Sequence, residues 1–94
     1  MALYLVSYDI AEKNHDYQLL WDRLGELRAT KILYSEWLLP HPNTGMAKPI
    51  ADDLVKRIAD GDRLLVQEVC GDAAWINLMI STDTMRKLLA NARC

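Results

Sequence analysis

The feature that most constrains the fold is a short strand-like segment with apolar side chains on both of its faces. Residues 3–10, LYLVSYDI, are rich in aliphatic and aromatic side chains and are followed by polar residues. Such a run predicts a β-strand that ends in a loop. Alternation divides its larger side chains between two faces, with Leu3 and Leu5 on one and Tyr4, Val6 and Tyr8 on the other. A sheet that contains this strand needs cover on both sides.

Hydrophobic periodicity predicts further strands and three helices. Residues 32–39 form a second extended segment, and whether residues 30–46 make one strand or two is left open. The remaining elements are expected as follows: amphipathic helices near 17–27 and 48–59, strands at 64–70 and 74–80, and a short helix from 82 to about 92. This order predicts a single α+β domain over residues 1–94.

The second extended segment is also apolar on both faces. Leu33, Trp37 and Leu39 oppose Ile32, Tyr34 and Leu38. Two main helices can cover one face of a four-stranded sheet, but the short C-terminal helix is too small to cover all of the other. At ~25 cal/mol per Å² of apolar area, exposing several such side chains would cost several kcal/mol. We therefore predict that the second face packs against another subunit, most simply in a homodimer.

Charge and cysteine content narrow the class of protein. The 94 residues carry a formal net charge of -2, which argues against a surface that is basic all over, so any site for RNA or DNA is expected to be local. The N-terminal sequence does not resemble a secretory signal, and no apolar run is long enough to span a membrane. Cys70 is expected to be a buried strand residue and Cys94 a free tail. These features predict a soluble, cytoplasmic protein.

Few residues offer recognisable chemistry. His15 and His41 lie far apart in the sequence and outside any metal-ligand spacing, so both are interpreted as solvated loop residues. The isolated glycines do not form a phosphate-binding loop. Trp21, Trp37 and Trp75 all fall in core patterns, so core packing is favoured over base stacking.

Asp9 is the strongest candidate, because a carboxylate at the end of an apolar strand is costly to bury without a partner or a cation. One interpretation is structural: Asp9 caps the following loop or pairs with Lys13. The other is a metal site, in which Asp9 and its copy across a dimer axis hold Mg²⁺ or Mn²⁺, ions that prefer oxygen ligands. Ser35 and Glu36 are expected mid-strand on opposite faces. For Ser35, a hydroxyl satisfied within the sheet is favoured over a catalytic one.

Three segments together resemble a known family. Tyr8-Asp9-Ile10 at the end of a strand, residues 20–27 (LWDRLGEL) in a helix and residues 32–37 (ILYSEW) in a strand are similar, in order and in residue type, to the second CRISPR-associated adaptation protein family. The resemblance covers roughly residues 3–80 and is more specific in its first half. The related virulence-associated protein D family shares the same fold.

The resemblance implies a ferredoxin-like βαββαβ fold, with an extra C-terminal strand or short helix, and a homodimer. It also implies a Mg²⁺-dependent endonuclease acting on RNA or DNA, with Asp9 as catalytic metal ligand and Ser35 at the position of the family's strand serine. Alternatives are a non-catalytic scaffold, which would bind another CRISPR-associated protein, and a toxin-type endoribonuclease. The acidic pI of 5.6 is unusual for a DNA-bridging dimer, so a stand-alone relative is a further expectation.

Overall fold

The computed structural model describes residues 1–11 and 17–93. It confirms the α+β class. The elements in chain order are β1 (Ala2–Asp9), α1 (Gln18–Glu26), β2 (Thr30–Leu33), β3 (Glu36–His41), α2 (Ala47–Val55), β4 (Arg63–Glu68) and α3 (Thr82–Leu89).

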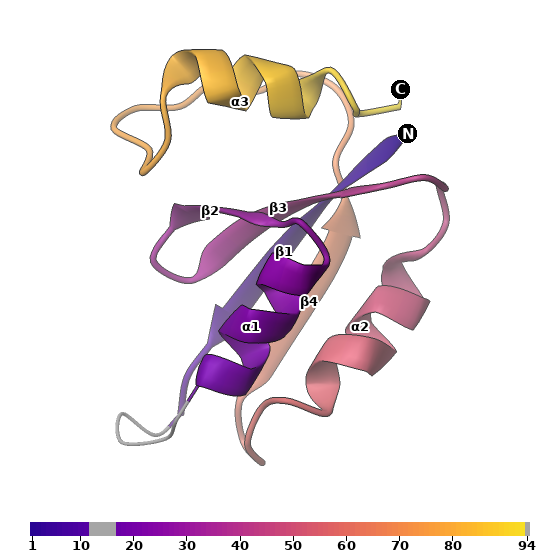
Figure 1. Cartoon of the computed structure of the whole chain (residues 1–94), viewed down its shortest axis with the longest axis vertical. Coiled ribbons are helices and arrows are strands. Elements are labelled where there is room, and N and C mark those ends of the chain that lie inside the picture. Colours follow the sequence, from indigo (N-terminus) through magenta and orange to yellow (C-terminus); the bar gives the residue numbers. More distant parts are fainter. Residues whose placement is uncertain (12–16, 94) are drawn as a thin grey trace.

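The four strands form one sheet in the order β2-β3-β1-β4, and each neighbouring pair is antiparallel. β1 is thus a central strand that lies between β3 and β4 (Figure 1). Its register sets Val6 opposite Trp37, and Ser7 opposite both Glu36 and Leu65. Because directly opposite residues in a sheet share a face, this register decides which side chains meet on each side.

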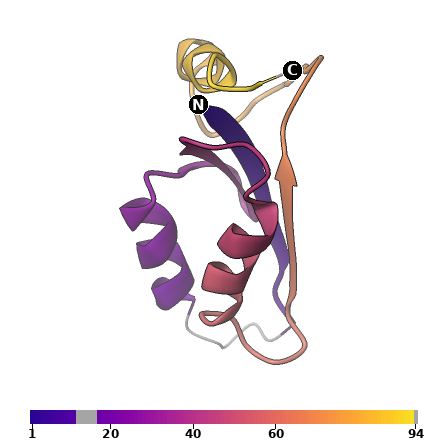
Figure 2. The same ribbon diagram turned by 90° about the vertical axis from the view of Figure 1, so that its right-hand side faces the viewer.

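The helices α1 and α2 cover one face of the sheet, as the sequence predicts (Figure 2). The core on this side contains buried residues from β1, β3 and both helices: Tyr4, Val6, Tyr8, Leu20, Leu24, Leu39, Ile50 and Leu54. Trp37 packs against the same core. The predicted alternation of β1 is therefore confirmed on this face.

The other face is covered only in part. Met85 of α3 is buried with Leu3, Ile32 and Leu38, and apolar residues of the segment 69–80 pack around them. Farther along β1 and β4, no helix of the described residues lies over this side of the sheet (Figure 2), and Leu65 is 53% exposed. The C-terminal helix is indeed too small to cover the whole face. A second subunit over the rest stays a prediction.

Two predictions about the strands need correction or completion. Residues 30–41 form two strands, β2 and β3, joined by a turn at residues 34–35. Residues 74–80, predicted as a strand, are irregular and touch the sheet through one backbone hydrogen bond, from the Met79 N–H to the Ile32 carbonyl (3.0 Å). Trp75, Leu78 and Ile80 pack, partly buried, on the second core, whereas Ile76 is 84% exposed, so the predicted strand is wrong.

Side-chain hydrogen bonds hold the loops around the sheet. The Tyr4 hydroxyl, on a fully buried side chain, donates to the Asn43 carbonyl (2.8 Å) and accepts from the Met46 N–H (2.9 Å), which fixes the loop before α2. Asp62 accepts hydrogen bonds from the backbone N–H groups of Ala11 and Ala59, both at 2.8 Å, and from the Tyr17 hydroxyl. Asp62 thereby joins the loop after β1, the start of α1 and the turn before β4.

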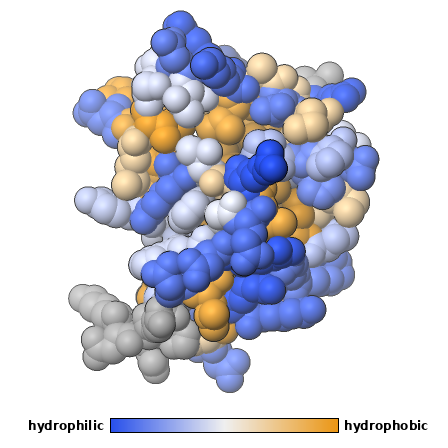
Figure 3. Space-filling model, viewed as in Figure 1, coloured by the Kyte–Doolittle hydropathy of each residue, from blue (hydrophilic) through white to orange (hydrophobic). Residues whose placement is uncertain are grey.

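The surface is mixed in character. Hydrophilic side chains cover much of the helical side, with smaller apolar patches between them (Figure 3). None of the helices in the described ranges is long and apolar enough to cross a membrane. Cys70 is exposed after the end of β4 and is disulfide-bonded, so the expectation of a buried strand cysteine is wrong. Cys94 lies outside the described residues.

Candidate functional site

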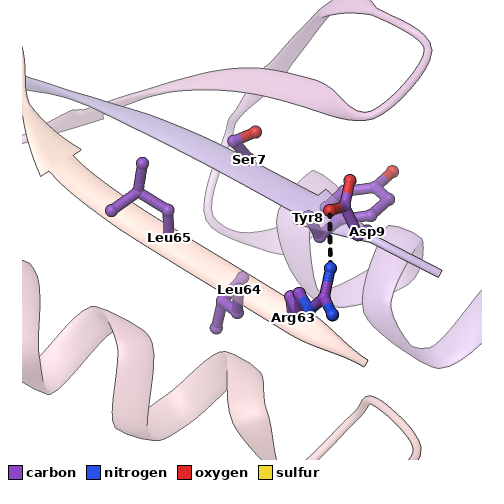
Figure 4. A pocket seen from close by; sticks show the side chains of 6 residues that line it. All are labelled: Ser7, Tyr8, Asp9, Arg63, Leu64 and Leu65. Atoms are coloured by element: carbon purple, nitrogen blue, oxygen red, sulfur yellow. Dashed lines mark ion pairs between the residues drawn. The ribbon is translucent and has the colours of Figure 1, made fainter. Parts of the chain in front are cut away.

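Asp9 lies at the end of β1 on the face that α3 leaves uncovered. Its side chain is 78% exposed and pairs with Arg63 of β4 at 3.9 Å between Oδ2 and the guanidinium (Figure 4). The premise that this carboxylate is buried is therefore wrong, and Arg63 is an ion-pair partner. Lys13, the partner expected in the structural interpretation, lies outside the described residues.

Two surface cavities meet at this strand end. One of about 260 Å³ is lined by residues of β1 and β4: Ser7, Tyr8, Asp9, Arg63, Leu64 and Leu65. The second, of about 170 Å³, is lined by Asp9 and Arg63 together with Ile10, Ala11 and Gly61. In Figure 4, Ser7, Asp9 and Leu65 rise from one side of the sheet, whereas Leu64 points to the other. Asp9 is thus accessible from both cavities.

Glu36 is a second carboxylate on the same face. It lies directly opposite Ser7 in the β1–β3 register, while its neighbour Trp37 packs on the opposite face. Asp9 is two residues beyond Ser7 on β1, so it shares this face with Glu36, and residues diagonally opposite in a regular antiparallel pair are roughly 7–8 Å apart. Among the described residues, no hydrogen bond or ion pair engages the Glu36 carboxylate, and this residue is half-buried.

The sequence did not identify Glu36 as a site residue, although the alternation that places Leu38 on the second face also applies to Glu36. The register of β3 against β1 decides which of the two side chains, Glu36 or Ser35, shares a face with Asp9. Only the fold supplies that register, because a shift by one residue exchanges the two faces.

Ser35 occupies the turn between β2 and β3, not the middle of a strand as predicted. Its carbonyl accepts a hydrogen bond from the Tyr8 N–H (3.1 Å), so its backbone lies beside the end of β1. No hydrogen bond of the Ser35 side chain occurs within the described part of the chain. The structure therefore brings Ser35 and Asp9 to the same end of the sheet without a contact between their side chains.

Tyr8 organises an aromatic cluster next to Asp9. The Tyr8 side chain is buried, and its hydroxyl accepts hydrogen bonds from the indole N–H groups of Trp21 (3.1 Å) and Trp37 (3.2 Å). Trp21 is 37% exposed, so its predicted place in the core is wrong, whereas Trp37 and Trp75 both pack against the cores. The cluster links α1 and β3 to the strand that carries Asp9.

The histidines do not join this site. His41, at the end of β3, accepts a hydrogen bond from the Asn43 N–H at Nδ1 (3.0 Å) and packs edge-on against Tyr4. It is half-buried, not a solvated loop residue as expected. His15 lies outside the described residues.

A complete metal site does not form within residues 1–11 and 17–93 of one chain, since no group of three or more acidic, histidine or cysteine side chains is close enough to hold an ion. Asp9 and Glu36 offer carboxylate oxygens, the ligands that Mg²⁺ and Mn²⁺ prefer. Arg63 supplies a positive charge beside Asp9 that suits a phosphate oxygen. This end of the sheet thus carries two carboxylates and one guanidinium on a single face.

Comparison with family models and with solved structures assigns no function to this site. No family model matches the chain, and no solved structure matches it. The fold and the site define an α+β domain with two carboxylates and an arginine at the open end of its central strand.

Proposed function

We propose that the protein is a homodimeric nuclease of ferredoxin-like fold, dependent on Mg²⁺ or Mn²⁺, whose phosphodiester cleavage centres on Asp9. The observation that carries the proposal is the exposed Asp9 beside Arg63 on the open half of a sheet face, with Glu36 on the same face of the neighbouring strand β3. In this proposal the protein works in the cytoplasm on RNA or DNA.

The ferredoxin-like assignment is supported by the order of the elements. The first six elements follow the sequence β-α-β-β-α-β, with both connecting helices on one face. β3 lies between β1 and β2, and β1 lies between β3 and β4, so each βαβ unit is split by one antiparallel strand. α3 is the additional C-terminal helix.

The homodimer is supported by the half of the second face that α3 leaves open. Leu65 of the edge strand β4 is 53% exposed there, and Leu5 and Ser7 of the neighbouring central strand are only half-buried. A second copy on this surface would complete the burial that both strands require. A two-fold axis near Ser7 would also bring two copies of Asp9 and Glu36 together, which would gather the carboxylates of both subunits at one place.

Each residue then has a task that follows from its position. Asp9 and Glu36 would hold the cation, which supplies an activated water and stabilises charge on the leaving oxygen. Arg63 orients the phosphate through its guanidinium, and Asp9 in turn restrains Arg63. Ser35 contributes a hydroxyl to the phosphate in this proposal, since its hydrogen bond with Tyr8 holds it at the same strand end.

A non-catalytic scaffold is the second candidate, and one observation favours it. Arg63 already neutralises part of the Asp9 charge, and no third acid within the described ranges joins the pair. A protein with this fold and dimer could bind another CRISPR-associated protein without cleaving nucleic acid. A toxin-type endoribonuclease would use the same residues on cellular RNA and would arrest growth when overexpressed.

A nuclease assay separates these candidates. Single-stranded RNA and duplex DNA are incubated with Mg²⁺, Mn²⁺ or chelator, and the wild type is compared with Asp9→Asn and Glu36→Gln. Loss of several kcal/mol of metal-assisted stabilisation predicts a drop in rate of roughly a hundredfold or more for Asp9→Asn. Asp52→Asn is the matched control, because Asp52 is an exposed helical acid paired with Lys48 at 3.0 Å.

Cleavage that persists in Asp9→Asn would remove Asp9 from the mechanism. A wild type inactive under every condition would favour the scaffold. Sedimentation at micromolar concentration tests the dimer separately, and a stable monomer would contradict it.

A further inference from the structure

The turn between β2 and β3 carries an exposed aromatic cluster that the proposed catalytic residues do not use. Tyr34 is 85% exposed at this turn, and Trp21 of α1 is 37% exposed. The Lys31 ammonium of β2 lies between them, 5.4 Å from the centroid of the Trp21 ring and 5.9 Å from that of Tyr34. Cation–π contacts of this length hold the three side chains in one group.

A hydrogen bond to a buried hydroxyl of β1 holds the Trp21 ring of this cluster. The Trp21 indole N–H donates to the buried Tyr8 hydroxyl at 3.1 Å, and this bond fixes the plane of the indole ring. The same hydroxyl accepts from Trp37, so Tyr8 is locked by bonds from α1 and β3. Tyr34 sits in a tight turn between two paired strands. The Trp21 ring is therefore positioned before any ligand arrives, which lowers the entropic cost of binding.

We infer that Tyr34, Trp21 and Lys31 form a binding site for an unpaired nucleobase and its phosphate, so that the preferred substrate of the proposed nuclease is a single strand. An exposed ring offers a flat face to any base, and a neighbouring ammonium suits the phosphate that follows it. Bases in a duplex are already stacked and cannot reach such a surface. This inference rests on the proposed function.

The stacking site lies at the same strand end as Asp9. Ser35 follows Tyr34 directly, and its carbonyl accepts the hydrogen bond from the Tyr8 N–H at 3.1 Å. Tyr34 and Asp9 are thus each one residue away from this bond. Trp21 and Lys31 lie on the helix-covered face, whereas Asp9 and Arg63 lie on the other, so a strand with one base on Tyr34 would have to pass around this end of the sheet to bring a phosphate to Asp9.

The charges around the cluster predict a modest, salt-sensitive affinity. Lys31 is the one cation of the cluster, and Asp22, the neighbour of Trp21 on α1, accepts a hydrogen bond from Gln18 (2.7 Å). If Lys31 neutralises one phosphate, it contributes about −0.7 to the slope of log K against log salt for a single strand. Base stacking then supplies most of the discrimination between single strands and duplexes.

Fluorescence anisotropy with labelled RNA, labelled single-stranded DNA and the duplex of the same sequence tests the inference. All measurements use Asp9→Asn protein in chelator, so that binding is read without cleavage. Tyr34→Ala is expected to weaken single-strand binding by roughly 5- to 150-fold, the range of one lost base–aromatic stack, while Tyr34→Phe keeps it. Lys31→Gln should reduce the salt slope by about 0.7, whereas Lys48→Gln, an exposed lysine on α2, should not.

Equal affinity for single strands and duplex, or Tyr34→Ala binding as tightly as Tyr34→Phe, would overturn the inference. The result that would reject the proposed nuclease activity is a different one. Single-strand binding that depends on Tyr34, in a wild type that never cleaves, would retain the stacking site and reject catalysis. A higher affinity for the RNA strand or for the DNA strand would identify which type of nucleic acid the stacking site prefers.

Discussion

Removing a single oxygen from Tyr4 should measurably destabilise the fold. Tyr4 is fully buried, and its hydroxyl donates to the Asn43 carbonyl and accepts from the Met46 N–H. Tyr4→Phe leaves both backbone groups without this partner, and a buried unsatisfied group costs about 1–3 kcal/mol. Because Asn43 is exposed, water can replace part of the loss at its carbonyl. We expect a loss of about 2 kcal/mol, which for a domain of this size lowers Tm by roughly 8–16 °C.

Urea denaturation followed by tryptophan fluorescence measures this loss. The m-value should not change, because the surface exposed on unfolding is nearly the same in both proteins. Tyr34→Phe is the matched control: the same atom is removed from a side chain that is 85% exposed, and the change should stay within about 0.5 kcal/mol. Equal stability of the two variants would show that the Tyr4 hydroxyl does not hold the loop before α2.

Two further predictions concern the helices. Gly25 of α1 has no heavy atom within 4 Å of the position that a Cβ would take. Gly25→Ala should therefore raise the free energy of unfolding by about 0.5–1 kcal/mol. A fall in the urea midpoint would contradict this prediction. The hydrogen-bonded Arg23 guanidinium holds the pKa of the Asp53 carboxyl below its ordinary 3.8, so Asp53 stabilises the fold fully above that value and loses this contribution as the pH falls through the folded-state pKa. The stability gap between wild type and Asp53→Asn should therefore be constant from neutral pH down to about pH 5 and shrink below pH 3.8, and a gap independent of pH in denaturant titrations would refute the reasoning.

Alternation along the strands was the most reliable guide to the fold. It divided the side chains of β1 correctly, since Tyr4, Val6 and Tyr8 belong to one core and Leu3 to the other. The spacing of Leu20 and Leu24 likewise identified the buried side of α1. Both patterns follow from backbone geometry, which fixes where successive side chains point regardless of their neighbours.

Features that depend on contacts distant in sequence could not be predicted. The segment 74–80 has the composition of a strand, but β-propensity reports a fit to a half-buried surface, which packing on the second core provides without pairing. The end of α1 is another example: the left-handed residue that follows the helix is Arg28 (φ 63°), although the nearby Gly25 would suit that conformation better. At Glu36 the missing information was the register of β3 against β1.

The two predictions that the fold leaves open, the dimer and the metal, are physically linked. A copy packed over Leu65 and Leu5 would remove Asp9 and Glu36 from water and bring their charges close to those of the partner. Carboxylates that lose water without a compensating charge destabilise an interface, and Arg63, at 3.9 Å from Asp9, offsets only part of this. A divalent cation between the subunits removes the repulsion, so a cation that binds the dimer must also strengthen it, by the same coupling free energy. The exposure of Asp9 in the single chain fits a cation-dependent dimer. Its carboxylate is hydrated in the monomer, and it would destabilise the dimer only if the two subunits associated without the cation.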